Sequence, residues 1–396
     1  SDTLLIAGGW VLRPDMQVEQ ADVFVDRDAG RIEAVGPDLD SERDPDTRLD
    51  AANGLVIPGL VNAHTHVAMT LLRGYADDKP LEAWLREDIW PAEAALTPED
   101  VRAGAELGVL EMIRSGTTAF ADMYFHVGEV VAAVEQAGLR ARVGHGAVTV
   151  GKDDADGRAD VEESIAVARE FDGAAGGRVR TAVMPHSLTT VSEPLLREAA
   201  AAARDDGIPV HFHANETRDE VDPIVEERSA RPLAYADDVG VLSREDFLAH
   251  AVHVDGSEID RLAAAGTAVV HCPASNMKLA SGIAPVKELL DAGVTVALGT
   301  DGAASNNDLD LFGEMRDAAM VGKLGADDAA AVPAAAAVRM ATRGGAAALS
   351  LPGGRNEPGA AASPAVVRPA SPPPTPSHAL VSHPAHAAPS PARLHT

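Results

Sequence analysis

The chain has 396 residues, enough to bury a large core in one big domain with an appendage. Its formal net charge of −28 repels phosphate, so we expect neither nucleic acid nor an anionic membrane as a partner. Acidic residues outnumber basic ones 61 to 33, a balance typical of adaptation to high salt, where screening relieves self-repulsion. Apolar runs are too short to span a membrane and no basic-then-apolar signal pattern opens the chain, which predicts a cytoplasmic protein.

Residues 1–54 are expected to form a small β module. Turn sequences at Gly8-Gly9, Asp28-Ala29-Gly30 and Gly36-Pro37 separate short apolar runs. The predicted strands are Leu4–Ala7, Trp10–Leu12, Ala21–Val25 and Ile32–Val35.

Residues 55–350 alternate short apolar strands with amphipathic helices, which predicts a parallel sheet closed into a (β/α)₈ TIM barrel. The predicted strands are Leu55–Ala63, Thr117–Met123, Ala141–Val148, Val179–Pro185, Pro209–His213, Phe247–Val252, Ala268–Cys272 and Val294–Gly299. The predicted helices include Pro98–Arg114, Val130–Ala137, Val161–Glu170, Glu193–Ala203 and Val286–Asp291. Active sites of such barrels lie at the C-terminal ends of the strands.

Residues 351–396 form a tail rich in proline and alanine. Proline at this density removes backbone donors and blocks helices and central strands, so we expect an extended or disordered segment.

A His-x-His pair ends the first predicted barrel strand. His64 and His66 project to the same side because side chains alternate along a strand, so the two rings can share one metal ion. Cys272 is the only cysteine, which excludes a cysteine-built zinc site and an intrachain disulfide. Any metal must therefore be held by nitrogen and oxygen.

Other strand ends supply the remaining groups. His213 ends the fifth predicted strand and Asp301 the eighth, so we assign His64, His66, His213 and Asp301 as ligands of one divalent metal, zinc first, with iron and manganese as alternatives. The metal would lower the pKa of a bound water. His250 can orient that water, and Glu216 can protonate a substrate nitrogen, so we count Glu216, His250 and Asp301 as the catalytic groups.

Each residue taken alone also has a structural interpretation. A histidine at a strand end is more often a hydrogen-bonded structural residue than a ligand, and we keep that interpretation for His211, His253 and His271. Asp301 would serve as a turn aspartate, and Glu216 as a carboxylate at a helix start. Their joint placement on the correct strands of one barrel favours the metal site.

The sequence resembles the amidohydrolase superfamily, and within it the 5′-methylthioadenosine/S-adenosylhomocysteine deaminases. The resemblance rests on Pro58 to His66, Met69 to Gly74, Asp122 to His126, Pro185 to Ser187, His213 to Thr217, Pro273 to Asn276 and Leu298 to Asn307. It implies a mononuclear metal hydrolase that replaces the purine 6-amino group with oxygen, with the ligands assigned above. It also implies a small N-terminal β-sandwich that a strand after the barrel completes, so the altered tail would leave this module incomplete.

The resemblance also implies roles in substrate binding. Glu93 matches the carboxylate that accepts hydrogen bonds from both ribose hydroxyls, and His186 matches a residue that contacts the base. His145 stands where some relatives have an arginine that grips the carboxylate of S-adenosylhomocysteine, whereas Arg158 matches a second such arginine. Loss of one guanidinium favours 5′-methylthioadenosine or another 5′-substituted adenosine.

Three alternatives remain open. A deaminase or hydrolase of another amino-heterocycle, such as guanine or a triazine, would have no use for a ribose-binding carboxylate at Glu93. A non-catalytic barrel would act as a scaffold and would have no reason to bind stoichiometric metal. A two-metal hydrolase of cyclic amides needs a bridging lysine that the middle strands do not offer. For the leading function we expect a small-molecule nucleoside substrate and a homo-oligomer.

Overall fold

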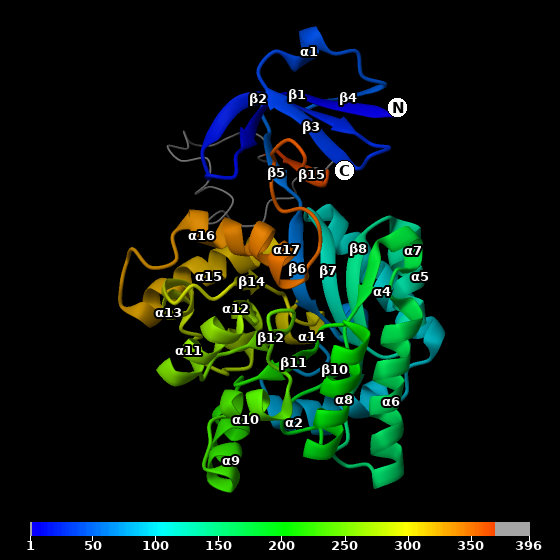
Figure 1. The fold of residues 1–396 in the computed structure, drawn as a ribbon, viewed down its shortest axis with the longest axis vertical. Coiled ribbons are helices and arrows are strands. Elements are labelled where there is room, and N and C mark those ends of the chain that lie inside the picture. Colours follow the sequence, from blue (N-terminus) through cyan, green and yellow to red (C-terminus); the bar gives the residue numbers. More distant parts are fainter. Residues whose placement is uncertain (1, 369–396) are drawn as a thin grey trace.

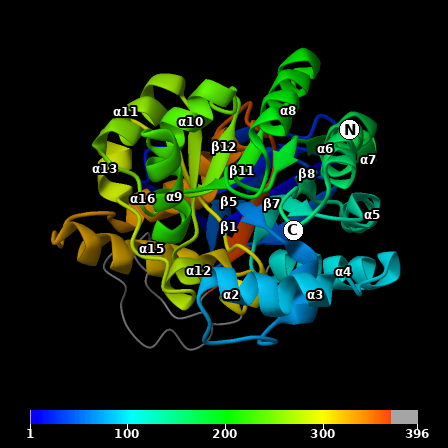
Figure 2. The ribbon, with the colours of Figure 1, turned by 90° about the horizontal axis from the view of Figure 1, so that it is seen from below.

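The computed structural model describes residues 2–368 and consists of a small β module above a larger α/β barrel (Figure 1). The helices surround the barrel strands, as the view along the barrel shows (Figure 2). Within residues 2–368, no helix is long and apolar enough to cross a membrane.

One six-stranded sheet forms the β module. Its order is β15-β5-β1-β2-β3, with β4 paired to β1. The strands are β1 (Thr3–Leu12), β2 (Val18–Asp26), β3 (Arg31–Gly36), β4 (Thr47–Asp50), β5 (Leu55–Pro58) and β15 (Pro364–Val367), and a short helix α1 (Leu39–Glu42) follows β3. The turn predicted at Gly8-Gly9 is instead an irregularity inside β1, where the register with β2 shifts and Gly8 has φ +80°.

The predicted strand Leu55–Ala63 is two strands. Gly59 separates β5, which belongs to the β module, from β6 (Leu60–Thr65), the first barrel strand. A side chain at position 59 would collide with Thr118 and with the backbone of Ser363, so only glycine fits here. The barrel therefore begins after Gly59 and not at residue 55.

Eight strand positions form the barrel. They are β6, β7 (Thr117–Tyr124), β8 (Arg140–Ala147), β9 (Val179–Thr181) with β10 (Met184–Pro185), β11 (His211–Ala214), β12 (Phe247–His250), β13 (Ala268–His271) and β14 (Val296–Leu298). All their pairings are parallel. The ring closes where the amides of Thr300 and Asp301 donate to the Asn62 side chain and the His64 carbonyl, each at 3.0 Å.

Helices cover the outside of the barrel and its C-terminal end. Those around it are α4 (Pro98–Arg114), α5 (Val127–Ala137), α6 (Asp154–Phe171), α7 (Ala174–Gly177), α8 (Glu193–Asp206), α10 (Pro232–Val239), α11 (Gly256–Ala265), α13 (Val286–Asp291), α15 (Leu311–Ala326), α16 (Ala334–Arg339), η3 (Met340–Gly344) and α17 (Gly345–Ala348). Those in the loops after the strands are η1 (Val67–Leu72), α2 (Leu81–Ala83), η2 (Trp84–Ile89), α3 (Trp90–Glu93), α9 (Arg218–Arg228), α12 (Pro273–Lys278) and α14 (Ala303–Asn306). The predicted helices Pro98–Arg114 and Val286–Asp291 match α4 and α13 at both ends.

Part of the expected tail belongs to the β module. Strand β15 pairs antiparallel with β5, so the module gains an edge strand that the proline-rich sequence did not predict. Pro364 occupies the first position of this strand, where a missing backbone donor is tolerated. Residues 369–396 of the predicted tail lie outside the described residues.

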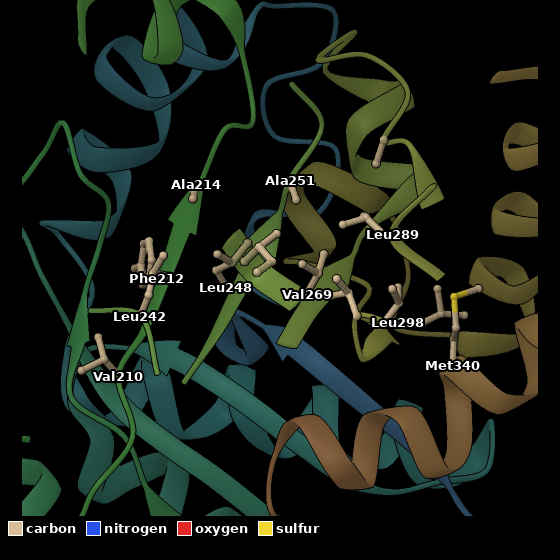
Figure 3. Close-up of a cluster of buried hydrophobic side chains, with 14 of the residues drawn as sticks. Val210, Phe212, Ala214, Leu242, Leu248, Ala251, Val269, Leu289, Leu298 and Met340 are labelled. Carbon is tan, nitrogen blue, oxygen red and sulfur yellow. The ribbon is translucent and has the colours of Figure 1, made fainter. Parts of the chain in front are cut away.

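Alternation along the barrel strands separates the core from the site. On β11 and just before it, Val210, Phe212 and Ala214 point outward into a buried apolar cluster with Leu242 (Figure 3). Side chains alternate along a strand, so His211 and His213 point to the barrel interior. The packing that fixes this strand therefore also fixes the direction of its histidines.

Candidate metal centre and active site

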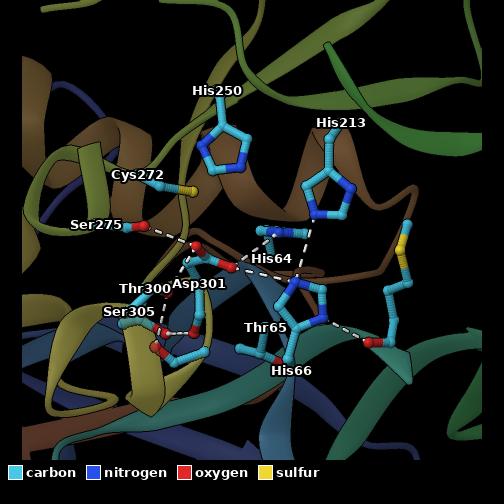
Figure 4. Close-up of polar contacts among 12 residues, drawn as sticks. His64, Thr65, His66, His213, His250, Cys272, Ser275, Thr300, Asp301 and Ser305 are labelled. Atoms are coloured by element: carbon cyan, nitrogen blue, oxygen red, sulfur yellow. Dashed lines mark hydrogen bonds and ion pairs between the residues drawn. The ribbon is translucent and has the colours of Figure 1, made fainter. Parts of the chain in front are cut away.

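The four predicted ligands meet at the C-terminal ends of the strands (Figure 4). His64, in β6, and His66, directly after it, place their Nε2 atoms 3.3 and 3.2 Å from Oδ1 of Asp301. The Nε2 atom of His213, from β11, lies 3.3 Å from Nε2 of His66. The barrel thus brings together side chains that are more than 200 residues apart in sequence.

Two of the histidines are anchored by backbone carbonyls. Nδ1 of His66 donates to the Met123 carbonyl at 2.6 Å, and Nδ1 of His213 donates to the His186 carbonyl at 2.7 Å. A neutral imidazole carries one ring proton, so in their neutral form both rings present an unprotonated Nε2 to the centre.

A second histidine anchors His64. Nδ1 of His211 donates to the Phe247 carbonyl at 2.8 Å, which leaves Nε2 of His211 as an acceptor. That atom lies 2.9 Å from Nδ1 of His64, so His64 donates to it and also presents an unprotonated Nε2. His211 is therefore a hydrogen-bonded structural residue, as expected from the sequence. Its hydrogen bond also orients His64, one of the proposed ligands.

The donor set fits a divalent metal ion. Three buried imidazole lone pairs and a carboxylate repel one another unless a cation lies between them. The ligand atoms of His64, His213, His250 and Asp301 all lie within 4.8 Å of one another, and His66 adjoins this group. Five side chains therefore surround one point, and the centre can hold an ion with a position left for water.

The pKa values of His64, His66 and Asp301 show how the site is protonated when no metal ion is bound. Burial lowers the pKa of His64 to about 4. Burial also opposes the charging of His66, but its hydrogen bond and charge interaction with Asp301, together with its contact to the Met123 carbonyl, outweigh this effect and raise the pKa of His66 to about 9. Burial would raise the pKa of Asp301, yet hydrogen bonds with the two histidines hold it well below its usual range. Metal binding must displace the His66 proton.

Two predicted catalytic groups lie beside this centre. Nε2 of His250 is 3.4 Å from Oε2 of Glu216, and both side chains are buried. Burial raises the pKa of Glu216 to about 8, and the nearby charge of Asp301 adds to this effect. Burial lowers the pKa of His250 to about 4. At neutral pH the metal-free site therefore holds a protonated carboxyl next to a neutral imidazole.

The wall of the cavity carries the predicted substrate-binding residues. A cavity of about 1230 Å³ opens from the centre and is lined by Glu93, Trp90 and His186. The ring of His186 lies 4.6 Å from that of His213 and 6.5 Å from that of Trp90, centroid to centroid. Burial raises the pKa of Glu93 to about 7, although neighbouring Tyr124 opposes this shift.

Arg158 does not join the other predicted site residues. Its guanidinium pairs with Glu198 at 2.6 Å, its side chain is half exposed, and it is absent from the lining of the cavity. This position on α6 faces solvent, where a carboxylate is the available partner. The cavity is lined instead by Lys152, whose Nζ lies 2.8 Å from Asp160. The sequence patterns assigned no role to Lys152.

A barrel that gathers histidines and an aspartate around one point, with a buried acid beside it, defines a metal-dependent hydrolase site. The model of the amidohydrolase family matches residues 55–389. The chain therefore belongs to the amidohydrolase family, and the resemblance stated from its motifs is confirmed.

The chain is also similar to individual proteins of this family. A 5-methylthioadenosine/S-adenosylhomocysteine deaminase of Haloarcula marismortui is 65% identical over 384 residues, which cover 97% of this chain and 88% of the relative. A protein of the same name from Halobacterium salinarum is 66% identical over 388 residues, covering 98% and 89% of the two chains. The crystal structure of an adenosine deaminase from Xanthomonas campestris with bound zinc superposes with a TM-score of 0.90 at 38% identity, covering 97% of this chain and 89% of the other.

Proposed function

We propose that the protein is a metal-dependent deaminase that hydrolyses the 6-amino group of 5′-substituted adenosines. The candidate substrates are 5′-methylthioadenosine, S-adenosylhomocysteine, adenosine and 5′-deoxyadenosine, and the products are the inosine analogue and ammonia. The proposal is carried by one observation: the nitrogen/oxygen centre, the buried acid Glu216 and the wall carboxylate Glu93 line the same cavity. The two halobacterial relatives support the substrate class by name.

His64, His66, His213 and Asp301 would hold the ion. We select His66 rather than His250 as the third histidine because both nitrogens of His250 already face other partners, Asn276 and Glu216. Zinc suits this donor set, and a zinc ion is bound in the Xanthomonas relative. A divalent ion lowers the pKa of a water molecule and so supplies a nucleophile near neutral pH.

Glu216 would move the protons. Its buried carboxyl group, whose pKa is raised by burial, donates a proton to the ring nitrogen next to the amino-bearing carbon, which makes that carbon a better electrophile. Water oxygen then adds to the carbon, and the resulting carboxylate accepts the proton that the water loses. The same proton passes to the amino group, the carbon–nitrogen bond breaks, and ammonia leaves. The remaining hydroxyl proton returns to Glu216 as the ring carbonyl forms, which restores the starting acid.

His250 and Asp301 would orient the attacking water. Neutral His250 faces the centre from β12, whereas the low pKa of Asp301 keeps its carboxylate ionised as an acceptor. Glu93 would accept hydrogen bonds from both ribose hydroxyls, and His186 would contact the base. Arg158 has no part in this arrangement because its side chain lies outside the cavity.

A panel of substrates tests the proposal. Zinc-loaded protein in high-salt buffer is mixed separately with 5′-methylthioadenosine, S-adenosylhomocysteine, adenosine and guanine, and loss of absorbance near the adenine band is followed. Turnover of the adenine nucleosides alone supports the proposal. Turnover of guanine alone, or of none of the four with metal bound, would favour a different amino-heterocycle, and failure to bind metal would favour a scaffold. The expected homo-oligomer and cytoplasmic location stay predictions.

A further inference from the structure

One stretch of chain contacts three different groups of the site. Residues 275–281, which we call the support segment, begin in α12 just after β13 and end before Gly282. Its three contacting side chains, Ser275, Asn276 and Ser281, are buried. Each one hydrogen-bonds to a different proposed catalytic residue.

Ser275 reaches the carboxylate of Asp301. Its hydroxyl donates to Oδ2 at 2.7 Å, and the hydroxyl of Ser305 donates to the same oxygen at 2.8 Å. The other oxygen, Oδ1, faces His64 and His66 (Figure 4). The two hydroxyls therefore set the rotation of the carboxylate and leave one oxygen for the metal centre.

Asn276 reaches His250. Its amide nitrogen lies 3.0 Å from Nδ1 of His250 and donates to it. Because a neutral imidazole carries one proton, that proton is then on Nε2, the atom that faces Glu216. Asn276 thus fixes both the orientation and the tautomer of this ring.

Ser281 reaches Glu216. Its hydroxyl donates to Oε1 at 3.2 Å. Oε1 is then an acceptor, so the contact sets the rotation of the Glu216 carboxyl group and leaves Oε2 facing Nε2 of His250.

The segment is itself tightly held. The amide of Ser281 donates to the Asn276 carbonyl at 2.8 Å, and the Ser281 carbonyl accepts from Nε2 of His253 at 2.7 Å. Gly282 follows with φ +135°, and a side chain there would meet Val252 at 2.8 Å and the His253 ring at 3.3 Å. The loop after β12 and the support segment are therefore packed directly against each other.

We propose that residues 275–281 act as a single positioning element that aligns Asp301, His250 and Glu216 relative to one another. Ser275, Asn276 and Ser281 are positioning residues, since each acts through another side chain. The inference rests on the proposed function for the roles of the three aligned groups, whereas the alignment itself rests on the hydrogen bonds above.

Three single substitutions test the three hydrogen bonds one at a time. Ser275→Ala should weaken zinc retention during dialysis against a chelator by roughly 10–100-fold, the usual effect of losing a partner of a metal ligand. Asn276→Ala and Ser281→Ala should retain zinc and substrate KM but lose kcat by roughly 10–100-fold. Ser281→Thr, which restores the hydroxyl, should recover most of the lost kcat. Thr342→Val removes a buried hydroxyl that bonds the Val338 carbonyl away from the cavity, and serves as the matched control.

A spectroscopic measurement on the unmutated, zinc-loaded protein is independent of turnover. Two-bond ¹H–¹⁵N spectra of histidine-labelled protein should show His250 protonated on Nε2, and Asn276→Asp should move the proton to Nδ1 because a carboxylate accepts from it. A proton on Nδ1 in the unmutated protein would overturn the role given to Asn276.

The remaining outcomes are equally decisive. If all three alanine variants bind less zinc, have a higher KM and unfold at a lower temperature to the same extent, the segment has only a structural role. If their kcat values equal that of Thr342→Val, the segment does not contribute to the active site. If the unmutated protein deaminates no nucleoside, the proposed function fails, while zinc retention and the His250 tautomer still test the alignment.

Discussion

Nδ1 of His64 donates to Nε2 of His211 across 2.9 Å, so a histidine outside the proposed ligand set fixes the tautomer of a histidine inside it. We predict that His211→Ala lowers zinc affinity by roughly 10–100-fold, because His64 loses the acceptor that directs its Nε2 to the centre. Zinc per chain after dialysis against graded chelator measures the change. His271→Gln is the control, since His271 is buried on β13, two strands from β11, and its ring has no hydrogen-bond partner among the described residues. Equal zinc retention in both variants would contradict the claim that His211 orients His64 for metal binding.

Glu216→Gln should abolish proton transfer but leave binding intact. An amide of nearly the same shape cannot donate and recover a proton, so we expect kcat to fall by roughly 10²–10⁴-fold with little change in KM. Steady-state kinetics with 5′-methylthioadenosine give both constants. A kcat within a few-fold of the parent would assign the proton transfers to another group.

Burial of Glu216 should also appear in the stability of the metal-free protein. Its pKa is raised from 4.5 to about 8, so between these values the folded chain keeps a proton that the unfolded chain has lost. The free energy of unfolding should therefore fall as pH rises through this window, and fall less in Glu216→Gln. Denaturant unfolding of parent and variant between pH 5 and 9 tests the sign. A difference that grows in the opposite direction would mean that the carboxyl is ionised.

Glu93→Ala should raise KM for nucleosides. The carboxylate would accept two hydrogen bonds from the ribose, and hydrogen bonds to charged groups contribute about 1.5–3 kcal/mol each, so a loss of at least tenfold is expected. A 2′-deoxy substrate provides the matched control, because it should bind more weakly to the parent and lose less on mutation. Identical kinetics of the parent and Glu93→Ala would contradict the claim that Glu93 binds the ribose.

The far wall of the cavity should favour 5′-methylthioadenosine over S-adenosylhomocysteine. Asp160 accepts from His145 and pairs with Lys152, each at 2.8 Å, and these contacts outweigh burial and lower its pKa to about 2. Lys152 is thus already neutralised, and within residues 2–368 the guanidinium groups that line the cavity, those of Arg86 and Arg228, are paired with Glu82 and Glu193. The ratio of kcat/KM for the two substrates measures the preference. Arg158→Ala should leave it unchanged, and a large change would show that Arg158 enters the cavity during catalysis.

The barrel and the centre could be predicted because their patterns are local. The His64/His66 spacing uses the two-residue repeat of a strand, and the alternation of strands and helices brings His213 and Asp301 to the same end. The limits of the barrel were harder to predict. The split at Gly59 depends on close contact with residues far away in sequence, and β15 forms because β5 offers an open edge, overriding the high proline content.

The supporting groups could not be predicted for a related reason. Hydrogen bonds such as Ser281 to Glu216 join loops whose geometry the sequence does not specify, and serine is common on any surface. Arg158 illustrates the converse, since a matched position along the chain does not fix the direction of a long side chain on a helix. Fold and ligands follow from periodicity, whereas orientation follows from tertiary packing.

The central claim is tested most directly by following the oxygen atom. Zinc-loaded protein is incubated with 5′-methylthioadenosine in ¹⁸O-labelled water, and the nucleoside product is analysed by mass spectrometry together with an ammonia assay. The account predicts a methylthioinosine that carries one labelled oxygen on the base, with one ammonia released per product. Unchanged substrate, or release of free adenine with the amino group intact, would contradict it.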